Sequence, residues 1–260
     1  MKRLALSVAI VVFAASTAFS QVIVNSAAYG GLLTNQTELN DEVRKDSGPM
    51  AGLYAQVILL NRFQVNDFLY YAWNVNDSTV LGNHFIADAY PLQFGIGSFV
   101  LGGGYEFIRL NLDDTSTEYT QNISIPYLRV GQYFNIPGPV RLSLLPWTGV
   151  GYQTVSGDGT VTIEIPGPTP NIEQDFTVDE SGYLWMNGIN LSVSVRRFLD
   201  VQAKYGLYYD VEAEEFSNNV TGMITAYLSR HIGVSYRAKY TESTGDNYNL
   251  YNMIGLAYSF

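Results

Sequence analysis

The two histidines and their acidic neighbours are the residues best suited to hydrolytic chemistry. His84 stands four residues before Asp88, and Asp113 and Asp114 follow in the next polar stretch. A hydrolase would use such groups as general acid and base within hydrogen-bond reach of one substrate. The chain has no cysteine and no GxSxG motif, and His231 falls in a short turn, so no complete catalytic constellation can be assembled. We therefore predict that the protein is not an enzyme, and a hydrolase built on His84 and Asp88 is the weakest of three hypotheses.

Charged residues inside alternating segments indicate a different chemistry, the passage of charged solutes. Arg237 and Lys239 are flanked by apolar residues in 231–241, and Lys204 has the same setting in 199–210. Side chains alternate between the two faces of a strand, so these cations lie on the polar faces. Charges that line a pore set its selectivity, and this basic row favours anions. The predicted lining residues are Arg129, Arg141, Lys204, Arg237, Lys239, Glu106 and Asp210, with Arg196 and Asp88 as further candidates.

The elements that must position these charges are strands, because alternation of period two recurs along the chain. The alternating segments are 22–33, 48–60, 65–76, 84–95, 99–112, 122–135, 140–155, 183–195, 199–210, 219–229, 231–241 and 249–260. The joints between them alternate in character. Short joints lie at 61–64, 96–98, 136–139, 196–198 and 229–231, and long polar joints at 34–47, 77–83, 113–121, 156–182, 211–218 and 242–248.

Segments of this length, joined by short turns at one end and long loops at the other, are typical of transmembrane barrels. An Arg or Lys facing lipid near the midplane costs about 2–4 kcal/mol, so the polar faces must turn inward. Closing the sheet leaves no unpaired backbone edge in lipid. We predict an all-β fold, a closed antiparallel transmembrane β-barrel of twelve strands with short periplasmic turns and long acidic outer loops. The segment 22–33 is the weakest strand, and ten or eight strands are the alternatives.

Charge is sorted between the two ends of this predicted barrel. The chain has a net charge of −10, and 19 of its 24 acidic residues lie in the long joints, with Arg44 and Lys45 as the only bases there. The short turns instead carry Arg62, Arg196, Arg197 and Arg230. An acidic outer end repels polyanions, so nucleic acid is excluded as a partner.

The first 20 residues have the features of a secretory signal peptide. Lys2 and Arg3 precede the apolar run 4–15, and Ala18 and Ser20 place small residues before a cleavage site at Gln21. The apolar run is too short to span a membrane as a helix. We predict cleavage before Gln21 and a single barrel domain over residues 21–260.

The chain ends on a Tyr/Phe-rich alternating strand that closes with Tyr258-Ser259-Phe260. With the signal peptide, this pattern resembles the outer-membrane β-barrel proteins of diderm bacteria, a porin-like class whose subfamily no motif identifies. The resemblance implies location in the outer membrane and contact with its lipid. It also implies that Tyr258 and Phe260 form the signal read by the barrel-assembly machinery.

Three functions are compatible with these features. The leading one is a passive pore for small hydrophilic solutes, with a preference for anions. In the second, the cations pair with Glu106 and Asp210, side chains fill the narrow lumen, and the barrel is structural or binds a surface partner. The third is the hydrolase. The segment 156–182 either rises outside as a hairpin or folds into the pore, and we expect no metal or cofactor site.

Overall fold

The chain is described by a computed structural model over residues 22–39, 42–60, 62–75, 78–114, 117–163, 172–196, 198–242 and 247–260. The predicted signal peptide, 1–20, lies outside these residues. No helix in the described ranges is long and apolar enough to cross a membrane.

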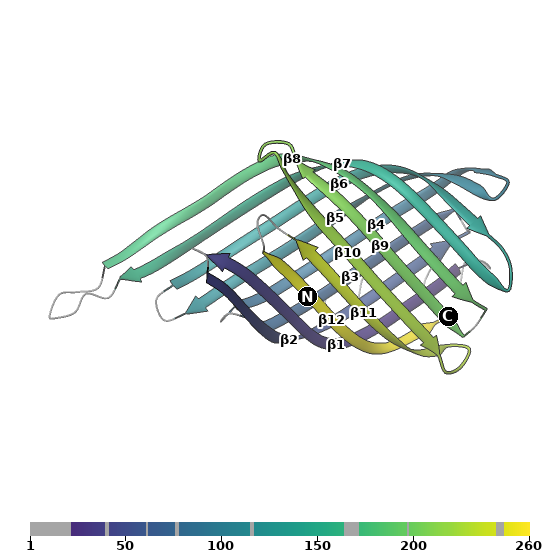
Figure 1. The fold of residues 1–260 in the computed structure, drawn as a ribbon, viewed down its shortest axis with the longest axis horizontal. Coiled ribbons are helices and arrows are strands. Elements are labelled where there is room, and N and C mark those ends of the chain that lie inside the picture. Colours follow the sequence, from purple (N-terminus) through teal and green to yellow (C-terminus); the bar gives the residue numbers. More distant parts are fainter. Residues whose placement is uncertain are drawn as a thin grey trace.

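Twelve strands form one sheet that closes on itself, as predicted (Figure 1). They are β1 (Val22–Leu39), β2 (Glu42–Leu59), β3 (Phe63–Val75), β4 (Ser78–Phe94), β5 (Gly97–Asp114), β6 (Thr117–Ile136), β7 (Val140–Ile163), β8 (Ile172–Val195), β9 (Leu199–Asp210), β10 (Glu215–Tyr227), β11 (Ile232–Glu242) and β12 (Tyr248–Ser259).

Each strand pairs antiparallel with its neighbours in sequence, and the barrel closes where β1 meets β12. Asn25 lies opposite Ser259, and Val24 and Phe260 exchange backbone hydrogen bonds of 3.1 and 2.8 Å. The weakest predicted strand, 22–33, is therefore the strand that closes the barrel. Both ends of the barrel sequence lie on one side, which we call the terminal end, and the opposite side is the hairpin end.

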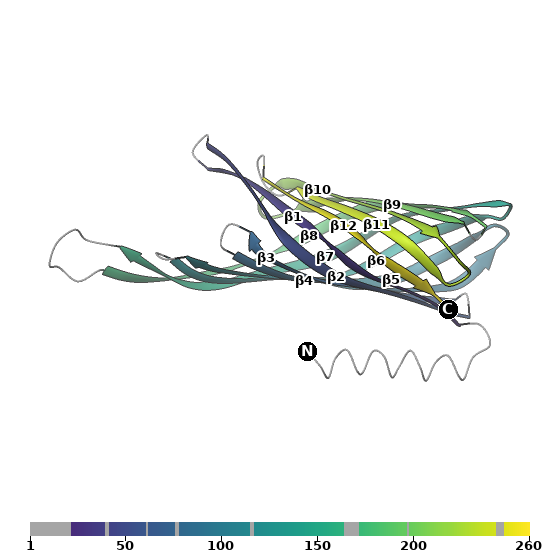
Figure 2. The ribbon, with the colours of Figure 1, turned by 90° about the horizontal axis from the view of Figure 1, so that it is seen from below.

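The polar segments predicted as long loops are largely strand, which corrects the expected boundaries. Residues 156–163 extend β7 and residues 172–181 extend β8, and this hairpin reaches beyond its neighbours at the hairpin end (Figures 1 and 2). The segment 156–182 thus takes the form of an external hairpin in its described part. The β-branched residues Thr, Val, Thr and Ile at 160–163 favour strand and continue the ladder after the apolar pattern ends.

The two faces of the wall differ as the alternation predicts. On β11, Gly233, Ser235, Arg237 and Lys239 are buried inside the barrel, while Tyr236 is exposed on its outer face. Two register shifts depart from this pattern: Asn74 adopts a φ of 56° and the register shifts after Ala72, which turns Val75 inward, and a second shift between Ala89 and Leu92 turns Leu92 outward. Bulges insert an extra residue and so reverse the faces that follow.

The hydrophobic core lies inside the barrel. Its largest cluster joins β1, β2, β3, β4 and β12 and contains Ala27, Tyr29, Leu33, Met50, Tyr54, Phe68, Tyr70, Ala72, Val75, Val80, Tyr251 and Met253. A second cluster on β4, β6 and β8 contains Ile86, Ile125, Tyr127, Leu184 and Met186. Aromatic and apolar side chains therefore occupy much of the space that a pore would leave to water.

Candidate functional site

An ion pair crosses the interior from one wall to the other. Lys239 Nζ on β11 donates to Glu106 Oε1 on β5 at 2.7 Å, and their side chains are only 4% and 8% exposed. In the closed ring, β5 and β11 are six strands apart in either direction. The pair therefore joins diametrically opposite strands and occupies the middle of the lumen.

Aromatic rings pack beside this pair. Phe68 stacks on Tyr70 at 5.6 Å between ring centroids, Tyr29 meets the Phe68 ring edge-on at 6.3 Å, and Tyr70 meets Tyr251 edge-on at 5.0 Å. The Tyr70 and Tyr251 hydroxyls lie 3.2 Å apart and share a hydrogen bond. We call the layer formed by Tyr29, Phe68, Tyr70, Tyr251, Arg237, Lys239 and Glu106 the septum.

Arg237 is the member of the septum whose charge is not neutralised. Its guanidinium carbon lies 3.8 Å from the centroid of the Phe68 ring and 5.6 Å from that of Tyr54, and the residue is only 6% exposed. Within the described chain, its buried Nε has no hydrogen-bond partner and no carboxylate pairs with it. Ring faces attract a cation, but they do not replace a hydrogen-bonding anion.

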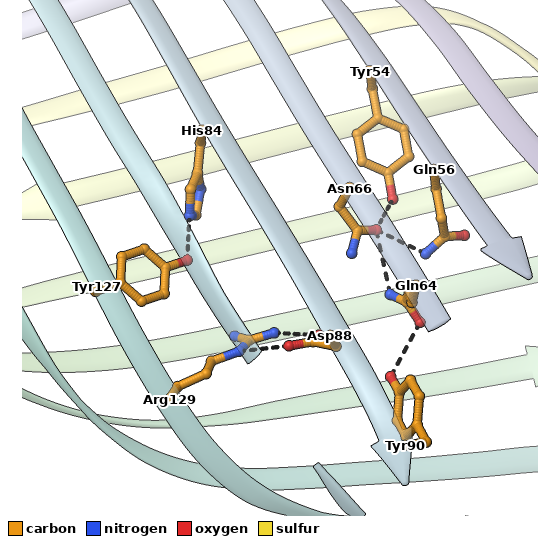
Figure 3. Close-up of polar contacts among 9 residues, drawn as sticks. All are labelled: Tyr54, Gln56, Gln64, Asn66, His84, Asp88, Tyr90, Tyr127 and Arg129. Atoms are coloured by element: carbon orange, nitrogen blue, oxygen red, sulfur yellow. Dashed lines mark hydrogen bonds and ion pairs between the residues drawn. The ribbon is translucent and has the colours of Figure 1, made fainter. Parts of the chain in front are cut away.

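The predicted pairing of His84 with Asp88 does not form (Figure 3). His84 Nε2 lies 3.3 Å from the Tyr127 hydroxyl, while Asp88 accepts two hydrogen bonds from Arg129, at 2.9 and 2.5 Å. Four residues of strand separate side chains on one face by about 13 Å, so His84 and Asp88 point the same way without meeting. The carboxylate opposite His84 in the sheet is instead Glu106.

Between the septum and the terminal end lies a cavity of about 510 Å³, which we call the chamber. A narrow recess of about 10 Å³ adjoins it at Gln202 and Lys204 and ends at Arg237. The charged side chains that line the chamber and recess are Asp88, Arg129, Arg141, Arg196, Asp200, Lys204 and Arg237.

Amide side chains line one side of the chamber, and Figure 3 shows the hydrogen bonds that connect them. Asn66 Oδ1 accepts hydrogen bonds from Tyr54 at 3.2 Å, Gln56 at 2.9 Å and Gln64 at 3.3 Å. Tyr90 in turn donates to Gln64 at 3.3 Å. These groups, on β2, β3 and β4, present donors and acceptors at fixed positions, which we call the amide wall.

No protein-family model matches the chain, and no curated protein matches its sequence. Among solved structures, the translocator domain of the autotransporter NalP from Neisseria meningitidis aligns with a TM-score of 0.57 at 13% identity, over 98% of this chain and 96% of that one. The transport unit of the autotransporter AIDA-I from Escherichia coli gives 0.51 at 12% identity, over 94% and 91%. The chain has the fold of bacterial outer-membrane β-barrels. A KdgM porin also aligns with this outer-membrane barrel, with a TM-score of 0.44 at 14% identity, over 90% and 99%.

The outer wall of this outer-membrane barrel carries an apolar band that ends in aromatic residues. Leu128, Val150 and Trp185 are exposed on it, and Tyr152 and Tyr183 lie side by side at 5.1 Å between ring centroids. Aromatic girdles mark the boundary of the hydrocarbon in such barrels. The fold and this wall together imply location in the bacterial outer membrane.

The predicted lining residues lie in the septum, in the chamber and in a turn at the hairpin end. Lys239 and Glu106 pair in the septum, Arg237 lies beside them, and Arg129, Arg141 and Lys204 line the chamber. Asp210 lies apart from them at the hairpin end and forms no ion pair with these cations, so the pairing that the plugged alternative gave it does not form. It caps the β9–β10 turn at the hairpin end, where its Oδ1 accepts hydrogen bonds from the backbone of Glu212 and Ala213 at 2.9 and 3.1 Å.

The amide wall and the aromatic septum did not figure in the sequence-based prediction. Their signal was present in the alternation, since Gln56, Asn66 and Tyr70 share the parity of inward-facing residues on their strands. Polar uncharged and aromatic residues are common on both faces of barrel strands, so parity alone does not select them.

The two residues of the predicted assembly signal lie on the outer wall. Tyr258 is 47% and Phe260 is 65% exposed, and the His231 ring stacks on Tyr258 at 5.9 Å. His231 Nδ1 also lies 2.7 Å from the Ser259 carbonyl oxygen and donates to it. This arrangement fixes the last residues of β12 against the neighbouring turn, and their role in assembly stays a prediction.

The external part of the β7–β8 hairpin carries several of the acidic residues of the hairpin end. Tyr119 on β6 stacks on Phe176 at 5.3 Å, and Thr160 donates to Asp175 at 2.8 Å. Partial burial, together with the carboxylates of Glu180 and Asp158, raises the pKa of the Tyr119 hydroxyl. Among the described residues, no three His, Cys, Asp or Glu side chains converge as a metal site would require.

Proposed function

We propose that this protein is a closed outer-membrane barrel that does not conduct in its resting state and that offers its chamber to small hydrophilic solutes at the terminal end. We assign that end to the periplasm, because both termini of an even-stranded barrel lie there. The observation that carries the proposal is the Lys239–Glu106 ion pair, which joins opposite walls at 2.7 Å.

The energy of this contact favours closure over a freely open pore. Lys239 and Glu106 are both buried, and separating them costs about 3–5 kcal/mol as long as either charge stays buried without its partner. The stacked rings of Phe68, Tyr70 and Tyr251 add to that cost.

The passive pore favoured by the sequence is the competing function. Twelve strands enclose a lumen between that of eight-stranded barrels, which side chains fill, and that of sixteen-stranded porins, which water fills. The side chains inside the lumen therefore decide whether the barrel is closed or conducts. The septum supports closure, while the polar chamber beneath it supports access from one side.

Planar-bilayer recording of the refolded residues 21–260 tests the proposal. We expect no steady conductance from the natural sequence, and we expect current from the variant that combines Phe68→Ala, Tyr70→Ala, Glu106→Ala and Lys239→Ala. The matched control combines Leu69→Ala and Tyr71→Ala on the exposed face of the same strand, and it should stay silent. Steady conductance from the natural sequence would overturn the proposal.

A further inference from the structure

Inside the barrel, positive charge exceeds negative charge at one place. Two ion pairs, Arg129 with Asp88 and Lys239 with Glu106, balance each other. Arg141, Arg196 and Asp200 also line the chamber, but they lie at or beside strand ends at the terminal end, which leaves Lys204 and Arg237 at the inner end. Within the described residues, neither of these two cations forms an ion pair or a hydrogen bond with a carboxylate. The charge of two cations is thus concentrated where the chamber meets the septum.

Both cations border the same small space. Lys204 on β9 and Arg237 on β11 line the recess together with Thr221 of the intervening strand β10. Lys204 also lines the chamber, so the recess is reached from the chamber past this side chain. A group that enters from the terminal end meets the ammonium of Lys204 first and the guanidinium of Arg237 behind it.

Arg237, which lines the recess, has unused hydrogen-bonding capacity. The residue is more than nine-tenths buried, and its Nε–H has no partner. Burying a charged group without a hydrogen-bonding counterion is costly, and a nearby ring face offsets only part of that cost. A guanidinium binds the oxygens of carboxylates and phosphates well. An oxygen of such a group would give Arg237 both a hydrogen-bond acceptor and a counterion.

The rest of the chamber defines the body of the ligand. The amide wall, with Gln56, Gln64 and Asn66, offers donors and acceptors that suit hydroxyl groups. The cavity of about 510 Å³ lies within the range of small-molecule sites. A cationic ligand is disfavoured, since Arg129 already occupies the Asp88 carboxylate and Tyr227 forms a hydrogen bond with Asp200, the other carboxylate that lines the chamber.

We propose that the inner end of the chamber, at Lys204 and Arg237, is a binding site for a small hydroxylated solute that carries one oxyanion. The oxyanion sits at the mouth of the recess beside Lys204, with one oxygen directed through the recess toward Arg237, and the hydroxylated body lies along the amide wall. This site deepens the proposed function, because it rests on the chamber ending at the septum.

Isothermal titration of the refolded protein in amine-oxide micelles, which carry no sugar headgroup, tests the site. The probes are D-glucuronate for the carboxylate, D-glucose 6-phosphate for the phosphate, and neutral D-glucose as the reference. We expect at least one anion to bind about tenfold or more tighter than glucose. Raising the ionic strength from about 0.01 to 0.15 M should weaken that binding, because the Debye length falls from about 30 to 8 Å.

Lys204→Gln and Arg237→Gln should each lower the anion affinity about tenfold or more. Arg230→Gln removes the same charge from an exposed turn outside the chamber and should bind as the natural sequence does. A retained mobility difference between boiled and unboiled protein shows that each variant is folded, and Lys204→Gln decides alone if Arg237→Gln does not fold.

Equal binding of both anions and glucose, or unchanged affinity in the Lys204 variant, would overturn the site. The two proposals fail in different ways. A silent barrel that binds no anion loses the site and keeps the closed state. A conducting barrel whose anion binding depends on Lys204 loses the closed state and keeps the site.

Discussion

Arg237 and Lys239 lie two residues apart on the same face of β11, yet their charges meet different surroundings. Lys239 reaches the Glu106 carboxylate on the opposite wall at 2.7 Å, whereas Arg237 rests on the Phe68 ring and its Nε–H has no hydrogen-bond partner in the described part of the chain. Both are more than nine-tenths buried. The strand decides which way a cation faces, and the opposite wall decides whether it is neutralised.

The largest expected effect is that of Lys239→Met. The substitution leaves the Glu106 carboxylate buried without its cation, so the free energy of unfolding should fall by about 3–5 kcal/mol. Denaturant unfolding of the refolded barrel in lipid vesicles measures the change.

Arg237→Met is the matched control on the same face of the same strand. It leaves no carboxylate orphaned, so we expect a change of about 1 kcal/mol or less in either direction. If Arg237→Met lowers the free energy of unfolding as much as Lys239→Met does, then pairing with Glu106 does not distinguish the two cations.

The double variant Glu106→Leu with Lys239→Met sharpens the comparison. Replacing both partners of a buried pair by apolar groups is often nearly neutral. The double variant should therefore cost at least about 2 kcal/mol less than the sum of the two single variants. Additive losses in the unfolding measurements would mean that the two groups do not interact.

Asp88→Asn should have a smaller effect than the loss of Lys239. It removes the carboxylate from Arg129, but the adjoining chamber can hold water that solvates the cation, so we expect a loss of about 1.5–3 kcal/mol. Asp210→Asn, which affects only a turn cap at the hairpin end, should cost about 0.5–1 kcal/mol in the same assay. A larger loss for Asp210→Asn than for Asp88→Asn would contradict this prediction.

The smallest effect concerns the ring beneath Arg237. Phe68→Leu removes the aromatic face that the guanidinium contacts at 3.8 Å. Its cost should be about 0.5–1.5 kcal/mol greater in the natural sequence than in the Arg237→Met background. Equal costs in both backgrounds would show that Phe68 acts by packing alone.

The alternation of side chains was sufficient to predict the barrel and the inward direction of its charges. Twelve segments of period two, sorted joints and a terminal strand of alternating aromatics indicated the closed sheet, and the burial of Arg237, Lys239 and Glu106 agrees with their parity. The boundaries at the hairpin end were wrong, because polar Thr-rich stretches such as 156–163 continue the backbone ladder beyond the apolar pattern. The alternation also did not predict the bulge at Asn74, where a single residue with left-handed backbone reverses the faces of the residues that follow.

The sequence by itself determined the class of fold, the two faces of each strand and the excess of basic residues on the inner face. All three follow from local rules of period and transfer energy. Only the tertiary structure decided that Lys239 meets Glu106, that Asp88 meets Arg129 and not His84, and that Lys204 and Arg237 have no carboxylate partner among the described residues. Contacts across a lumen join strands up to six places apart in the sheet, and they depend on the curvature, tilt and register of the whole barrel, which no local period encodes.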